Sequence, residues 1–287
     1  MPPCKVASAA DYDVVSPLSG ITKEDSKQPD DDYDPILKGL FLFTTYLCLS
    51  MVVWILIAPA SWLIGRSTFH REFLIPLLER MDVYIVVPSS IVTKYQDQQL
   101  IHFTHFIPSA IWAAIIPFQL HPQWRNGHFK LHRPLGYAFF ACTFLVTAGV
   151  FIILHRKLTA AHFFPDLEET NTTLWDFLMV GWALWFGFTS IQAVRFARAK
   201  KIVDHQKWMI RHVASGIWIA VQRMVLVPFF MVYYKWIARE KPTQWAQREI
   251  FSATGLVAWW SSIALAEYAH RRISRLKEAE TSSKKLN

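Results

Sequence analysis

Charged side chains inside long apolar runs are the residues of this sequence best suited to chemistry. Arg223 stands at the centre of an uncharged run, with eleven residues on each side of it between His212 and Tyr234. An arginine at the centre of a bilayer must face protein or water, and such residues are functional candidates, with a structural ion pair as the alternative. Glu267 closes the next apolar run, so we expect a direct or water-bridged contact between the two. A desolvated carboxylic acid can donate a proton, and a cation can hold an enolate, carboxylate or phosphate group.

Histidines form the second candidate group. Six of the eleven lie near ends of apolar runs that we expect to share the cytosolic face. His132 and His205 are the strongest candidates, because each precedes or opens a run and Asp204 could fix the tautomer of His205. The predicted site in the cytosolic half of the bundle has the catalytic residues His132, His205, Arg223 and Glu267, and the substrate-binding residues His105, Arg133, Trp208 and Arg211.

A further histidine pair lies within the second apolar run. His102 and His105 are three residues apart on one helix face, a spacing that suits metal ligation or hydrogen bonding between helices. Counting residues from the turn at 119–133 places His105 level with about Gly149 of the following antiparallel run. His155 then lies roughly 12 Å too far out to share a haem with His105, which disfavours a two-haem arrangement.

Motifs of the common soluble chemistries are absent. The sequence has no Gly-rich phosphate loop, no GxSxG elbow and no HExxH motif. Cys4 lies in a polar tail, whereas Cys48 and Cys142 lie inside apolar runs, so no disulfide framework or CxxC site can form. The sequence therefore predicts no metal site and requires no cofactor.

The elements that must position these residues are membrane spans. Of the 287 residues, 53% are hydrophobic and 15% aromatic, and the mean hydropathy is +0.20. The net charge of +8 comes from basic clusters at the ends of apolar runs, which is typical of membrane orientation and not of nucleic-acid binding. The predicted fold class is an all-α polytopic membrane helical bundle, with the lipid bilayer as its first partner.

Six runs are long and apolar enough to cross a hydrocarbon core about 30 Å thick. A seventh candidate, 73–92, carries Glu79, Arg80 and Asp82 near its middle, each costing about 2.5–3.5 kcal/mol there. We expect it to be an interfacial helix instead, with an apolar face at four-residue spacing. The six runs are 39–65, 100–120, 134–154, 174–194, 212–234 and 250–266, and the apolar face of the interfacial helix is Phe69, Phe73, Leu77 and Met81.

These runs divide the chain into five parts. Residues 1–36 hold eight of the 22 acidic residues and show no apolar periodicity, so they are predicted to be a disordered cytosolic tail. The other parts are 37–65, the first span; 66–99, a lumenal or external segment with the interfacial helix; 100–268, a five-helix membrane domain; and 269–287, a basic cytosolic tail.

Charge asymmetry predicts the orientation. With six spans, and leaving out the distant Lys5, one side of the membrane carries 18 Lys and Arg and the other carries 10. The positive-inside rule then puts both termini in the cytosol, in an endomembrane or the plasma membrane. Asn171 begins an Asn-Thr-Thr glycosylation pattern on the other side, so we expect a glycan there. The oligomeric state is not fixed by the sequence.

Several strings together resemble a known family. They are His105 to Gln119, Leu131 to Gly136, His205 to Arg211, Arg223 with Pro228, and Trp259 to Glu267. The chain is similar over about residues 100–268 to an uncharacterised family of predicted multi-pass membrane proteins that is defined only as a domain of unknown function. The resemblance implies a membrane bundle and supplies no activity. This chain departs from the family at His212-Val213-Ala214, where the family often has Ser-Tyr-Ala.

Three functions fit the sequence. The first is an enzyme or accessory protein acting on a lipophilic small molecule, with a terpenoid or polyketide secondary-metabolite pathway as one setting. The second is a redox protein with a single b-type haem held by His132 and His205, because such a haem needs neutral imidazoles from two helices. The third is a structural, transport or scaffold protein in which polar residues lock helices together. Fungal membrane terpene cyclases of similar size are an analogy only, because their motifs are absent.

Overall fold

The computed structural model describes residues 34–57, 72–73, 75–82, 94–95, 97–121, 129–159 and 172–286. The chain divides into two units, Met1–Pro35 and Ile36–Asn287, and the fold below is that of the second. The predictions for the acidic tail up to residue 33, for Phe69, for Asn171 and for residues 58–65 of the first span lie outside the described residues.

Helices are the regular elements of the described residues, six of them long and apolar enough to cross a membrane. This confirms the predicted all-α bundle with six spans. The elements are α1 (Pro35–Ile57), α2 (Ile75–Arg80), α4 (Gln99–Ile101), η5 (His102–Phe106), α5 (Ile107–Leu120), α7 (Phe129–His155), α8 (Thr172–Arg198), α9 (Ile202–Val221), η8 (Gln222–Leu226), α10 (Val227–Val232), η9 (Tyr233–Ala238) and α11 (Gln244–Leu286), where η marks a π-helix.

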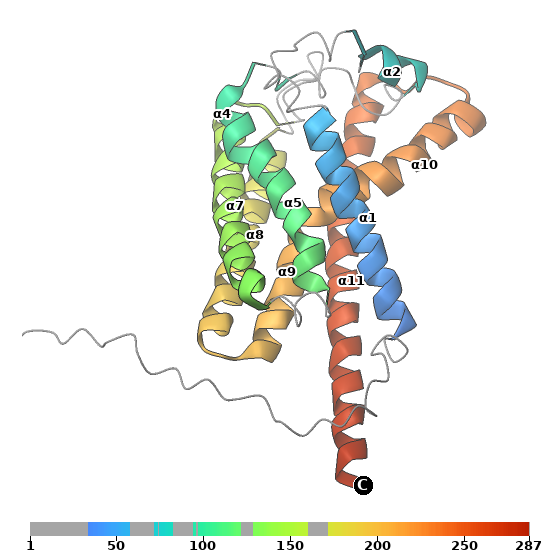
Figure 1. The fold of residues 1–287 in the computed structure, drawn as a ribbon. Helices are drawn as coiled ribbons and strands as arrows, with labels where there is room; N and C mark the ends of the chain where they lie inside the picture. Colours follow the sequence, from blue (N-terminus) through green and yellow to red (C-terminus); the bar gives the residue numbers. More distant parts are fainter. Residues whose placement is uncertain are drawn as a thin grey trace, which may run out of the picture. The chain divides into compact units, whose positions relative to one another are not determined.

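The long helices bury aromatic and aliphatic side chains between them and expose further apolar side chains on the outside. In Figure 1, α5, α7, α8, α9 and α11 run alongside one another, and α1 crosses in front of α11. Trp112 of α5, 2% exposed, packs in the core with Phe139 of α7 and Phe186 of α8. By contrast, Phe177 and Trp236 are 73% and 69% exposed. An apolar outer surface suits a lipid environment, because lipid tails solvate such side chains as well as a protein core does.

His212 of α9 joins four helices through a buried polar network. The Nε1–H of Trp112 donates to His212 Nε2 at 3.2 Å, and Nε2 lies 3.1 Å from the Thr143 hydroxyl of α7. Because an indole N–H can only donate, Nε2 must be unprotonated and Nδ1 must carry the hydrogen. Nδ1 accordingly lies 3.1 Å from both the Phe186 carbonyl and the Thr189 hydroxyl of α8. A neutral Nδ1–H histidine thus fixes the relative positions of α5, α7, α8 and α9.

Two of the π-helical segments, η5 and η8, each lie between α-helical parts of one span. In each segment a backbone N–H donates to the carbonyl five residues earlier. These hydrogen bonds run from the Ile107 N–H to the His102 carbonyl and from the Val227 N–H to the Gln222 carbonyl. Each is followed by a proline within the first two residues of the next α-helix. Proline has no N–H and cannot continue an α-helical ladder, so a wider turn before it lets the helix proceed. In Figure 1, α10 turns away from the direction of α9 beyond η8.

The short helix α2 lies across one end of the bundle, near the far end of α10 and η9 (Figure 1). Lys235 of η9 donates to the Asp82 carboxylate at 2.8 Å, and this hydrogen bond lowers the pKa of Asp82. Leu78 is buried, whereas Phe73, Leu77 and Met81 are exposed. The exposed side chains belong to the apolar face expected from the sequence, and an interfacial position for this helix stays a prediction. We call this end of the molecule the α2 end.

The last span continues beyond the expected boundary. Helix α11 runs without interruption from Gln244 to Leu286 and therefore includes most of the 269–287 segment. Near the end opposite α2, Arg211 of α9 donates from its NH2 to Glu267 of α11 at 3.0 Å and makes a second bond through Nε. This bidentate ion pair joins α9 to α11. The division of the chain into five parts stays a prediction.

Candidate ligand cavity

A cavity of about 530 Å³ lies in the half of the bundle nearest α2. All six spans contribute to its wall, together with α2 and residues 94–95. Most of the lining is aromatic or aliphatic, and five methionines add side chains that adapt to the shape of a ligand. No Asp or Glu is found among its described lining residues. Under the predicted orientation, this is the lumenal or external half.

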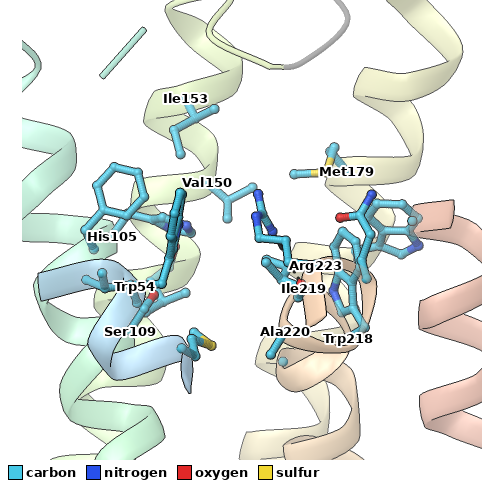
Figure 2. A pocket seen from close by; sticks show the side chains of 18 of the residues that line it. Trp54, His105, Ser109, Val150, Ile153, Met179, Trp218, Ile219, Ala220 and Arg223 are labelled. Atoms are coloured by element: carbon cyan, nitrogen blue, oxygen red, sulfur yellow. Dashed lines mark hydrogen bonds between the residues drawn. The ribbon is translucent and has the colours of Figure 1, made fainter. Parts of the chain in front are cut away.

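Arg223 is the most prominent polar group of the cavity. It projects from η8 into the open space, with Trp54 and His105 on one side and Trp218 on the other (Figure 2). Its NH1 lies 3.4 Å from the Ile219 carbonyl, one turn back on its own helix. Within the described part of the chain, no carboxylate lies within ion-pair distance of this guanidinium. Arg223 therefore presents a positive charge to an apolar cavity.

Lys94 adds a second cationic group to the same wall. Its Nζ donates to the Leu158 carbonyl at 2.7 Å and lies 4.6 Å from the centre of the Tyr95 ring. The Tyr95 hydroxyl donates to the same carbonyl at 3.2 Å. Burial, and then the positive charge of Arg223, lowers the pKa of Lys94 to about 7. Burial also raises the pKa of Tyr95, which keeps its hydroxyl protonated.

His105 enters the cavity because α7 approaches η5 closely. A Cβ added at Gly149 would lie 2.6 Å from the His105 Cβ, so only a glycine fits there. This contact confirms the predicted level of His105 beside Gly149. His105 Nδ1 lies 3.3 Å from the Val146 carbonyl, which can only accept, so Nδ1 carries the hydrogen and Nε2 remains an acceptor. The His102 side chain does not line the cavity, and its Nε2 bonds the Tyr95 carbonyl at 2.7 Å.

Tryptophans form much of the remaining wall. Trp182 lies 4.9 Å from Trp218, measured between ring centres, and 5.6 Å from Trp259. Trp112, held by His212, closes the cavity towards the middle of the bundle. A Cβ at Gly216 would lie 2.4 Å from the Trp112 ring, so this glycine leaves room for the indole. The cavity is thus cationic on the wall formed by Lys94 and Arg223 and aromatic elsewhere.

The predicted site residues fall into two groups. Arg223 and His105 line the cavity. The other six do not line it and come from the opposite ends of their helices. They are His132, Arg133, His205, Trp208, Arg211 and Glu267.

The expected contact between Arg223 and Glu267 was wrong. Glu267 pairs with Arg211, which precedes Arg223 by twelve residues, or about 18 Å of helix rise. The expected contact assumed that the middle of each span coincides with the middle of its uncharged run. In the structure the spans extend further, over Ile202–Ala238 and Trp245–Leu276, which shifts the level of Glu267 relative to Arg223.

Five of the six residues at the opposite end make contacts that hold helices together. The Arg211 guanidinium lies 4.9 Å from the Trp208 ring centre while it binds Glu267. His205 Nδ1 lies 2.9 Å from the Ala193 carbonyl of α8. The Gln119 amide donates to the His132 carbonyl at 3.0 Å, and Arg133 is exposed. These contacts join α5 to α7, α8 to α9 and α9 to α11.

Lys94, Tyr95 and Trp54 are cavity residues that the sequence analysis missed. Lys94 and Tyr95 precede a span and carry no motif, so only the fold reveals that they reach the cavity. Within the described ranges, no three His, Cys, Asp or Glu side chains come together as a metal site. A haem between His132 and His205 stays a prediction.

Comparisons with known proteins do not identify a relative. No family model, curated protein or solved structure matches the chain. The resemblance to a family of unknown function therefore rests on the quoted motif residues, and the function must be argued from the cavity.

Proposed function

We propose that this multi-pass membrane protein binds a lipophilic small molecule in the cavity at the α2 end, as an enzyme or an accessory protein. The observation that carries the proposal is the cavity itself, which measures about 530 Å³ and has a largely apolar wall. Pockets for drug-sized ligands typically measure about 300–1,000 Å³ and combine apolar walls with a few polar groups. The size and the composition of this cavity both fit that description.

The polar groups of the cavity define what it can do to a ligand. Arg223 and Lys94 can hold an anionic or polarised oxygen, and the His105 Nε2 is an acceptor that could take up a proton. A lipophile of a terpenoid or polyketide pathway would suit the aromatic wall. His132, His205 and Glu267 do not line the cavity. We therefore place any chemistry on Arg223, Lys94 and His105.

A cavity-filling substitution tests the proposal. Ala183 of α8 lines the cavity and is 5% exposed, whereas its neighbour Leu184 is 59% exposed on the outside of the bundle. We expect Ala183→Phe to weaken binding of a neutral fluorescent naphthylamine probe at least tenfold, because the new ring occupies the ligand volume. Leu184→Phe is the matched control and should bind as the wild type does. A folded Ala183→Phe protein with unchanged probe binding would refute the proposal.

A structural or scaffold role is the second candidate. It is supported by the His212 network and by the bond between Arg211 and Glu267, because these polar contacts lock helices together and His212, Arg211 and Glu267 do not themselves line the cavity. This role predicts that substitutions inside the cavity change only stability. The Ala183→Phe experiment distinguishes the two roles, because it compares probe binding with the thermal midpoint of the same variant.

A further inference from the structure

The charge distribution of the cavity restricts the kind of ligand it can hold. Arg223 and Lys94 both face the space, and no described lining residue carries a negative charge. A cationic ligand would be repelled by both groups. A neutral ligand would leave the charge of Arg223 without an ionic partner in an apolar site, where charges without a counter-ion are costly.

From this distribution, and building on the proposed function, we propose that the ligand is an amphiphile with one anionic headgroup, a carboxylate or a phosphate. The headgroup lies between Arg223 and Lys94, and the apolar tail lies among the aromatic side chains. Arginine suits such a headgroup because its planar guanidinium can bind two oxygens at once.

Hydrogen bonds to backbone carbonyls hold both cationic side chains in the cavity wall. The bond from Lys94 Nζ to the Leu158 carbonyl, at 2.7 Å, fixes the position of the ammonium in the cavity wall. Arg223 makes one long bond to Ile219, which leaves other N–H groups of the guanidinium for a ligand. Burial and the charge of Arg223 lower the pKa of Lys94 to about 7, and an anion between the two groups would offset both effects.

The aromatic wall provides the place for the tail. Trp112 closes the cavity towards the middle of the bundle, and Trp218 and Met179 lie beside Arg223 (Figure 2). These side chains offer no charge and few polar atoms, so they favour hydrocarbon. Amphiphiles with one polar and one apolar end therefore match both the charge and the wall of the cavity.

The test compares headgroups on one tail. The purified full chain, in nanodiscs of neutral phosphatidylcholine, is titrated with oleate, oleyl phosphate and oleyl alcohol, in competition with the neutral naphthylamine probe. We expect at least one of the two anions to compete at least tenfold better than the alcohol. We also expect Arg223→Gln to remove that preference and Lys94→Gln to reduce it.

Arg80→Gln is the matched control. Arg80 is exposed on α2, at the same end of the molecule, and does not line the cavity. Its removal changes the general positive charge of this end, so the anion preference should persist. Should Arg223→Gln fail to fold, Arg223→Lys keeps the charge and should retain a reduced preference.

The outcomes separate this inference from the proposed function. Equal competition by oleyl alcohol and both anions in the wild type would overturn the anionic headgroup and leave the lipophile cavity standing. No competition by any of the three, with no binding of the probe, would overturn both. Competition by inorganic phosphate as strong as that by oleyl phosphate would overturn the amphiphile, because it would show a site for a free anion.

Discussion

The affinity of the cavity for an anion should fall as the pH rises above about 7. Burial and the charge of Arg223 lower the pKa of Lys94 to about 7 in the unliganded protein. A bound anion favours the charged ammonium, so the pKa of Lys94 is higher in the complex than in the free protein. The free protein must then take up a proton to bind at high pH. Affinity is therefore full below the free pKa and is lost as the pH rises through it.

The size of the effect follows from the charged fraction of Lys94. With a free pKa of about 7, about half of the lysine is charged at about pH 7, and about one part in a hundred at about pH 9. If the pKa in the complex lies above this range, the dissociation constant rises about fifty-fold over those two units, approaching tenfold per unit. The corresponding difference in binding free energy is about 2.3 kcal/mol.

The assay should use a probe that stays charged at every pH. Hexadecyl sulfonate fulfils this condition, and its dissociation constant can be measured by competition between about pH 6 and about pH 9, the range that brackets the pKa of Lys94. Three other titratable groups line the same cavity as Lys94, namely Arg223, Tyr95 and His105. The variant Lys94→Arg isolates the lysine, because its guanidinium stays charged over the whole range. It should bind with little change in affinity above about pH 7. A wild-type affinity that is flat over this range, or a Lys94→Arg variant with the same slope as the wild type, would refute the reasoning.

Three further predictions concern the fold. Gly149→Ala should lower the free energy of unfolding by about 1–3 kcal/mol, because the new Cβ would lie 2.6 Å from that of His105. Gly181→Ala is the control, since a Cβ added there would have nothing within 4 Å, and it should be neutral or stabilising in the same thermal-denaturation assay. Arg211→Met and Glu267→Gln should each cost about 1 kcal/mol, since the pair is 22% and 31% exposed, and a double mutant as unstable as the sum of both would contradict the bond. Tags at either terminus should be accessible only from the cytosol, and a protease-protection assay that placed the termini on opposite faces would exclude the six-span topology.

Much of the fold could be predicted because the bilayer imposes simple requirements. A span needs about twenty apolar residues in a helix, and the six runs of the sequence meet that condition. Local counting was also reliable across a short connection, since it placed His105 beside Gly149, where the structure has a close contact. Arg223 could be selected as a functional candidate because a charge in an apolar run is costly, and charged residues in membrane spans typically mark functional sites.

The partners of the candidate residues could not be predicted. Their levels depend on where helices begin and end, and α11 begins at Gln244, six residues before the expected 250. The π-helical turns add residues that an α-helical count does not include. The cavity depends on which side chains leave space between packed helices, and no sequence pattern encodes that space. Lys94 lies before α4 and outside every apolar run, so nothing in the sequence indicates that it lines the cavity.

The π-helical segments η5 and η8 affect how this chain would align with any relative. A π turn holds one more residue than an α turn, so η5 and η8 each equal a single-residue insertion in a regular helix. A homologue without the insertion would have a one-residue gap within 102–106 or 222–226. Each residue in an α-helix advances about 100° around the axis, so the gap would rotate the flanking parts of the helix by about that angle. Such a homologue would direct a different side chain at the position of His105 or Arg223. A gap at either place would therefore mark a change of ligand more clearly than a substitution elsewhere.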